Sequence, residues 1–146
     1  MNHIIFTAAA RTCQVFDAGG ALRLECEARN DTVETEKHGP KFYGHFGACP
    51  VGEYSLGRAR DNAAEKPGEL VAEGPYYVPL VDVNGLWLAN DRSDIGVHGG
   101  GTELPAPDAP EQGWAVTLGC WRLQNADLRR FVALTASGDR VTVVHG

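Results

Sequence analysis

The sequence has no apolar run near the ~20 residues that a membrane-spanning helix needs, so we expect no membrane span. It also lacks a basic surplus. The net charge is −6, which argues against nucleic acid or an anionic membrane surface as a partner. Residues 1–8 lack the basic start of a signal peptide. We therefore expect the chain to stay in the cytoplasm unless another route exports it.

No internal repeat and no linker of biased composition divides the chain. Its 146 residues, of which 43% are hydrophobic, suffice for one domain with its own core, which we assign to residues 1–146. Cysteine is scarce, and a chain of this length needs no disulfide for stability. We expect most of the four thiols to be reduced: Cys13, Cys26, Cys49 and Cys120.

Strand-like segments dominate the pattern. A hairpin over residues 11–27 would place Cys13 opposite Cys26, as two small buried residues or as a cross-strand disulfide. A second hairpin is indicated by Asn84-Gly85, with residues 86–88 as its returning strand. Further strands are expected over residues 50–57, 69–83, 95–98 and 139–144. Loops are expected over residues 29–50, 59–68 and 99–113.

One amphipathic helix is expected late in the chain. Asn125 has the side chain of a good N-cap, and Asp127 suits the first turn. Apolar residues then recur at helical spacing, and Gly138 can close the helix.

Two glycine-rich segments carry the chemistry. Residues 95–101 are Ile-Gly-Val-His-Gly-Gly-Gly, and residues 117–123 are Thr-Leu-Gly-Cys-Trp-Arg-Leu. A thiol becomes a good nucleophile when a base takes its proton, and imidazole is the usual base. Glycines beside both residues let a substrate backbone approach. The pair His98 and Cys120 therefore indicates acyl transfer through a thioester.

These segments resemble the L,D-transpeptidase catalytic domain, also called the YkuD domain. That family has a His-Gly segment, a spacer, and a Ser/Thr-His-Gly-Cys segment followed closely by arginine. Here the corresponding residues are His98-Gly99, then Thr117 to Cys120, then Arg122, with 18 residues between His98 and Thr117. A Pro-x-Gly-x-aromatic segment at residues 50–54 adds to the resemblance. Leu118 departs from it, because the family has histidine at that position.

The resemblance implies a mainly β fold, a β-sandwich or mixed sheets, with one helix after the cysteine. It implies Cys120 as nucleophile and His98 as base, acting on peptidoglycan stem peptides without metal or cofactor. The acyl group would pass to a second stem peptide, a D-amino acid or water. Carbapenem-type inhibitors are then possible ligands. The substrate would lie in the periplasm or cell wall. Five further residues are expected at the substrate: Gly99, Thr117, Gly119, Trp121 and Arg122.

The roles of these residues stay open in part. Arg122 would bind a substrate carboxylate or brace the cysteine loop, Thr117 would orient the histidine, and Trp121 would form a wall of the core or groove. Backbone N–H groups around Gly119 and Cys120 would stabilise the oxyanion.

Asp94 lies four residues before His98, where it would orient the imidazole or stand in solvent.

Several alternatives remain. The variant motif is similar to secreted antibacterial effectors of type VI secretion systems, and a non-catalytic peptidoglycan-binding module is a further possibility. An α/β-hydrolase is disfavoured because no Gly-x-Ser-x-Gly elbow accompanies the His-Gly-Gly-Gly segment. A zinc site built from His45, Cys49, Cys13 and Cys26 matches no standard spacing.

Overall fold

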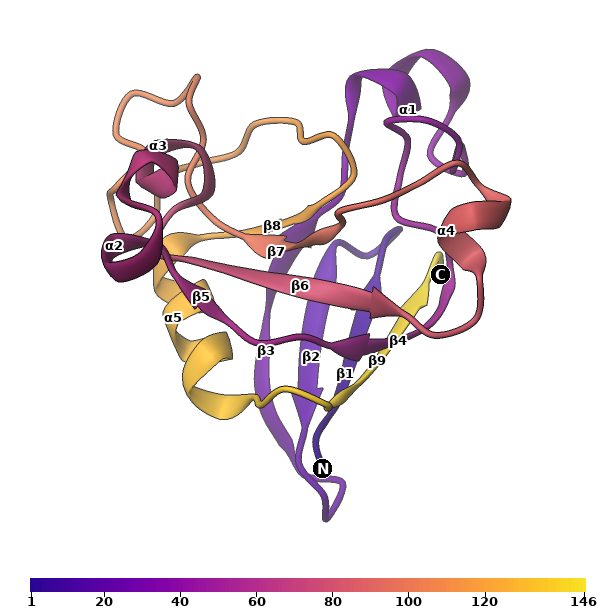
Figure 1. Cartoon of the computed structure of the whole chain (residues 1–146), viewed down its shortest axis with the longest axis horizontal. Helices are drawn as coiled ribbons and strands as arrows, with labels where there is room; N and C mark the ends of the chain where they lie inside the picture. Colours follow the sequence, from indigo (N-terminus) through magenta and orange to yellow (C-terminus); the bar gives the residue numbers. More distant parts are fainter.

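The protein is described by a computed structural model that covers residues 1–146. Nine strands form one mixed sheet (Figure 1). They are β1 (His3–Thr7), β2 (Thr12–Phe16), β3 (Leu22–Arg29), β4 (Gly52–Leu56), β5 (Arg60–Asp61), β6 (Tyr76–Asp82), β7 (Gly96–His98), β8 (Trp121–Leu123) and β9 (Arg140–Val144).

The sheet closes on itself. Its strand order is β4-β9-β1-β2-β3-β8-β7-β6-β5, and β4 also pairs with β6. Only β1–β9 and β7–β8 are parallel pairs, while the others are antiparallel. The mainly β fold expected from the sequence is confirmed.

Helices are short apart from α5 (Asn125–Leu134), which follows the cysteine as expected. It packs against β3 and β6 (Figure 1). The others are α1 (Val33–His38), α2 (Asn62–Glu65), the 3-10 turn η1 (Pro67–Glu69), α3 (Leu70–Glu73) and α4 (Leu86–Ala89).

Within a largely aliphatic core, three aromatic rings pack between the strands and α5. Phe6 of β1 stacks on Trp121 of β8, with ring centroids 4.7 Å apart, and its ring lies 6.4 Å from that of Phe131. All three side chains are fully buried. Trp121 directly follows Cys120 and begins β8. Its stacking on Phe6 therefore anchors β8 in the core.

The first hairpin forms as predicted. Cys13 and Cys26 face each other across β2 and β3, both buried and both free thiols. Residues 99–113 contain no helix or strand, which confirms the long loop between the two glycine-rich segments.

The hairpin predicted at Asn84-Gly85 is wrong, because residues 86–89 form α4 instead of a strand. The Asp82 carboxylate accepts hydrogen bonds from the N–H groups of Asn84, Leu86 and Trp87 at 3.1, 3.2 and 2.9 Å. These bonds satisfy amides at the start of a helical turn, so the chain coils where a two-residue turn was expected.

Three expected boundaries also change. The loop over 29–50 contains α1, which begins with a capping box between Thr32 and Thr35. The loop over 59–68 contains β5 and α2. The strand over 69–83 begins only at Tyr76, because residues 67–73 form helical turns.

We expect Phe131→Ala to lower the free energy of unfolding by about 3–5 kcal/mol, because it empties a fully buried aromatic site. Urea denaturation measures this loss. Val132→Ala, in the same helix but only partly buried, is the matched control and should cost clearly less. Equal losses would contradict the assignment of Phe131 as the anchor of α5.

Candidate active site

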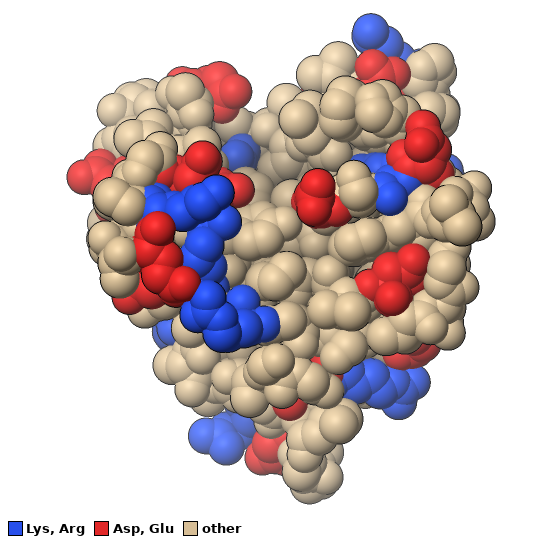
Figure 2. Space-filling view, viewed as in Figure 1, with Lys and Arg blue, Asp and Glu red and all other residues tan.

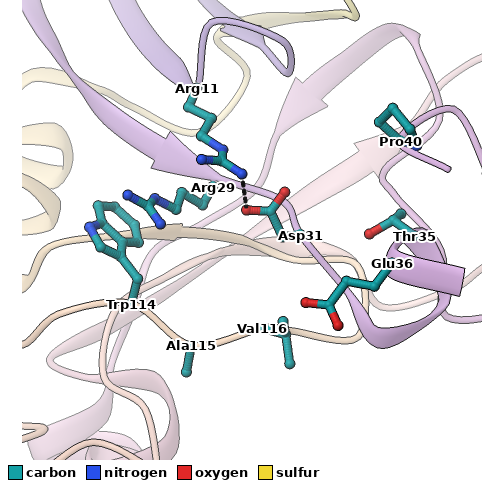
Figure 3. A pocket seen from close by; sticks show the side chains of 9 residues that line it. All are labelled: Arg11, Arg29, Asp31, Thr35, Glu36, Pro40, Trp114, Ala115 and Val116. Carbon is teal, nitrogen blue, oxygen red and sulfur yellow. Dashed lines mark ion pairs between the residues drawn. The ribbon is translucent and has the colours of Figure 1, made fainter.

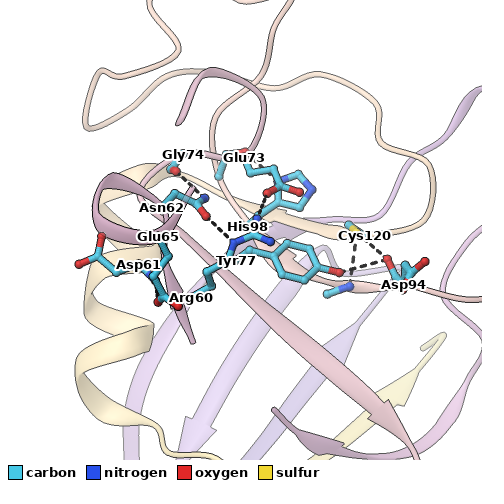
Figure 4. A network of polar contacts seen from close by, with 12 residues as sticks. Arg60, Asp61, Asn62, Glu65, Glu73, Gly74, Tyr77, Asp94, His98 and Cys120 are labelled. Atoms are coloured by element: carbon cyan, nitrogen blue, oxygen red, sulfur yellow. Dashed lines mark hydrogen bonds and ion pairs between the residues drawn. The ribbon is translucent and has the colours of Figure 1, made fainter. Parts of the chain in front are cut away.

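The parallel pairing of β7 with β8 brings the two glycine-rich segments together. Val97 pairs with Trp121, and His98 pairs with Arg122. One step back along both strands, the Gly96 N–H donates to the Cys120 Sγ at 3.3 Å. Residues separated by more than twenty positions thus form one site, and Figure 4 shows His98 and Cys120 on neighbouring segments of it.

His98 has a fixed tautomer. Its Nδ1 lies 2.8 Å from the Gly99 carbonyl oxygen, which can only accept, so Nδ1 carries the proton and Nε2 keeps a free lone pair. Burial lowers the pKa of His98 to about 4, so the imidazole is neutral at neutral pH. The carbonyl of Gly99, rather than the Asp94 carboxylate, is the hydrogen-bond partner that orients the ring.

Cys120 is partly exposed, and its thiol lies at the edge of the core. Burial is the main cause that raises the pKa of Cys120, and the Gly96 N–H bond opposes it. The Sγ also lies 3.7 Å from the Asp94 carbonyl oxygen. At neutral pH the site therefore holds a neutral thiol beside a neutral imidazole.

Tyr77 belongs to the same site and was missed by the sequence interpretation. It faces His98 across β6 and β7, with ring centroids 6.1 Å apart, and its hydroxyl donates to the Asp94 carbonyl at 3.1 Å (Figure 4). A Cβ at Gly96 would lie 2.6 Å from the Tyr77 ring, so glycine is needed there. Only the strand register shows this, because Tyr77 lies far from both motifs in the sequence.

The glycines after His98 pack against the protein itself. The Gly99 N–H donates to the Glu73 carbonyl at 2.7 Å, and the Gly100 N–H donates to the Asn125 Oδ1 at 2.9 Å. A Cβ on Gly99 would collide with Asn125. Gly99 is buried, so it allows close approach of the protein's own chain rather than of a substrate. The expectation that Gly99 lies at the substrate is therefore wrong.

Asn125 is not the N-cap of α5, which begins after Gln124. Besides holding Gly100, its side chain donates to the carbonyls of Pro107 and Ala109, each at 2.8 Å. A buried amide with three partners thus ties α5 to the start and the middle of the long loop.

Arg122 is buried and braces the cysteine loop, the second of its two expected roles. Its Nη1 donates to the carbonyls of Ala115 and Val116 at 2.5 and 3.3 Å, and its Nε donates to Gly99 at 3.3 Å. Only 4% of the residue is exposed, so a substrate carboxylate does not reach it from solvent.

The Thr117 hydroxyl also acts within this loop instead of on the histidine. It donates to the Cys120 carbonyl at 2.8 Å and accepts from the Gly119 N–H at 3.1 Å. The Gly119 N–H is therefore already used, whereas the Cys120 N–H has no partner in the protein.

Trp121 and Leu118, which flank Gly119 and Cys120, lie in opposite surroundings. Trp121 is fully buried in the core, which corrects its expected place at the substrate. Leu118, at the position of the family's histidine, is 65% exposed.

The thiol opens onto a groove of about 200 Å³ between two loops and the cysteine segment. It is lined by His45, Phe46, Asp91, Arg92, Ser93, Asp94, Leu118 and Cys120. A larger cavity, about 420 Å³, lies elsewhere, between Arg11, Arg29, α1 and Trp114 (Figure 3). Neither His98 nor Cys120 lines it, so the smaller groove is the one that matters for the chemistry.

The residues considered for zinc do not assemble. No group of three or more His, Cys, Asp or Glu side chains is placed to hold a metal ion. Cys13 and Cys26 lie in the hairpin, while Cys49 is buried beside the Tyr54 hydroxyl.

Charged side chains of both signs occur in small groups on the face shown in Figure 2, where no broad basic surface is visible. None of the helices has the length and apolar character required to cross a membrane.

Comparisons with known proteins show the family and the fold. The sequence profile of the YkuD family, described as the L,D-transpeptidase catalytic domain, matches residues 28–143. The chain therefore belongs to the YkuD family of L,D-transpeptidase catalytic domains. No curated protein sequence matches the chain.

Several solved structures share the fold. Bd1075 of Bdellovibrio bacteriovorus has a TM-score of 0.68 at 16% identity, over 99% of this chain and 48% of that one. The helical cell shape determining protein Pgp2 of Campylobacter jejuni has 0.66 at 20% identity, over 99% and 47%. An L,D-transpeptidase of Stackebrandtia nassauensis has 0.60 at 16%, over 99% and 55%. The chain thus spans about half the length of these proteins.

The buried histidine makes stability depend on pH. Because the pKa of His98 falls from 6.5 to about 4 on folding, the unfolded chain binds more protons between these values. We expect about 3 kcal/mol of stability from this residue above pH 6.5, lost as the pH falls to about 4. Urea denaturation across this range measures the loss, and His98→Gln should reduce the slope. An unchanged slope would contradict a neutral buried imidazole.

Proposed function

We propose that the protein transfers acyl groups of peptidoglycan stem peptides through a thioester on Cys120. The observation that carries this proposal is the His98 Nδ1–H bond to the Gly99 carbonyl, which leaves Nε2 as the base on the strand next to Cys120. Membership of the YkuD family supports the substrate class and the reaction type.

In the first half-reaction, His98 Nε2 accepts the thiol proton while the sulfur attacks a carbonyl carbon of the stem peptide. This carbonyl belongs to the L-centre of the diamino acid that precedes the C-terminal D-residue. The tetrahedral intermediate then expels the C-terminal D-residue, whose nitrogen receives the proton from His98. The acyl group stays on Cys120 as a thioester. In the second half, an amine or water attacks this thioester, His98 takes the proton of the attacking group, and the thiol is restored.

Hydrogen-bond donors near the sulfur would stabilise both the thiolate and the oxyanion. The Gly96 N–H already points at Sγ and would stabilise the developing thiolate. The Cys120 N–H, free of any protein partner, is available to an oxyanion on the attacked carbonyl. Because the resting pair is neutral, the proposed proton transfer to His98 accompanies the attack of the sulfur on the substrate.

The acceptor decides the biological role. A second stem peptide gives cross-linking, a free D-amino acid gives exchange, and water gives carboxypeptidase activity. The proposed substrate would place the action of the protein in the periplasm or cell wall. A secreted effector would use the same chemistry, whereas a non-catalytic binding module would not need a histidine base and a thiol on neighbouring strands.

Cys120→Ala should abolish the release of the C-terminal D-residue from a tetrapeptide stem, because the nucleophile is gone. Mass spectrometry of the incubated peptidoglycan fragments separates loss, exchange and dimer formation. The matched control is Cys26→Ala, which removes a buried thiol of the hairpin and should leave the reaction intact. Full activity of a folded Cys120→Ala variant would overturn the proposal.

His98→Ala should slow acylation of Cys120 by about 10²–10⁴-fold at neutral pH, because the base is lost. Imipenem is a suitable probe, since the L,D-transpeptidase LdtMt1, with a TM-score of 0.56 and 17% identity, has been solved with it. The residual rate should rise with pH, because burial raises the pKa of the thiol. An unchanged rate at neutral pH would mean that the base lies elsewhere.

A further inference from the structure

Arg92 lies beside the cysteine loop and lines the same groove as Cys120. Its Nη1 donates to the carbonyls of Ala48 and Tyr43 at 2.6 and 3.3 Å, and its Nη2 donates to Leu118 at 3.1 Å. These three bonds fix the guanidinium between the loop before β4 and the segment that leads to the thiol.

The guanidinium retains donors that the protein does not use. Arginine carries five N–H groups, and the three carbonyls leave the Nε–H and one Nη2–H without a protein partner. Arg92 is only partly buried, and its Nη2 bond to Leu118 lies in an exposed position. A bound molecule in the groove can therefore accept from a cation whose orientation is already set.

Arg92 also lies close to the reacting sulfur. A Cβ on Gly119 would collide with the Arg92 Nη2, so the guanidinium rests directly on the Gly119 Cα. The Cys120 Cα is ~3.8 Å further along the chain. The family's histidine is replaced by Leu118 here, and the main chain of this same residue is what Arg92 holds.

The other charged groups of the groove do not compete for this position. The Asp91 side chain is 91% exposed and lies 3.9 Å from His45, while Asp94 is exposed at the rim. Arg122 is buried, and main-chain carbonyls occupy its fork. Arg92 is thus the cation of the groove with both free donors and access to solvent.

The reaction supplies a matching anion. In a peptide cut at its last bond, only the amide nitrogen and one Cα separate the attacked carbonyl carbon from the free terminal carboxylate. With the sulfur ~3–3.5 Å from that carbonyl carbon, the carboxylate lies near Cys120, and Arg92 lines the same groove. Guanidinium groups favour carboxylates because two N–H groups donate in parallel.

We infer that Arg92 binds the free α-carboxylate of the C-terminal residue that leaves the stem peptide, and so selects chain ends over internal bonds. This inference rests on the proposed function. It assigns to Arg92 the contact with the substrate carboxylate that the sequence analysis gave as one possible role of Arg122.

Two tetrapeptide stems test it, one ending in a carboxylate and one in a carboxamide. Release of the last residue is followed by mass spectrometry, and kcat/KM is compared. The wild type should prefer the acid by about 10- to 100-fold, the range of a hydrogen-bonded charge. Arg92→Gln should bring this ratio close to one by slowing the acid alone. Arg92→Lys should keep part of the preference, and Arg129→Gln, on the exposed face of α5, should keep all of it.

The outcomes separate the two proposals. If the wild type cleaves both stems equally, or if Arg92→Gln slows both by one factor, Arg92 only holds the loops and the inference fails while the proposed function stands. If the wild type forms no thioester with either stem or with imipenem, the proposed function fails and takes the inference with it. If Arg92→Gln folds poorly, a wild type without preference for the acid still overturns the inference, and the Arg92→Lys ratio still tests the assignment to Arg92.

Discussion

The Gly99 carbonyl oxygen is the point on which the site depends. It accepts from the Nδ1 of His98 and from the Nε of Arg122, so one atom sets the tautomer of the base and anchors the arginine that braces the cysteine loop. Its own residue is held by Glu73 through the amide N–H. Moving this carbonyl would disturb base, brace and nucleophile together, because the three meet through the parallel pairing of β7 and β8.

Much of the architecture follows from local sequence pattern. The alternation in β2 and β3 and the short turn between them determine the register that sets Cys13 against Cys26. The apolar spacing after Cys120 locates α5. The glycine-rich flanks and the spacing point to His98 and Cys120, although the glycines after His98 pack against the protein itself.

The remaining features depend on contacts between distant residues. Helix α4 forms at residues 86–89 because the Asp82 carboxylate accepts hydrogen bonds from its first N–H groups. The Asn-Gly pair alone does not reveal this. From the sequence, Trp121 is expected in the groove because it follows the reactive cysteine. In the structure it stacks on Phe6 and is buried in the core. Strand register places Tyr77 in the site, and loop packing places Arg92 there. No sequence motif around either residue indicates a role.

The closure of the sheet bears on how the protein behaves in a crowded solution. Because β4 pairs with both β9 and β6, the end of the strand order that would be open is used internally, and the other end is the two-residue β5. Unpaired strand edges are the usual templates for uncontrolled association between copies. The fold thus offers little to edge-on aggregation between copies.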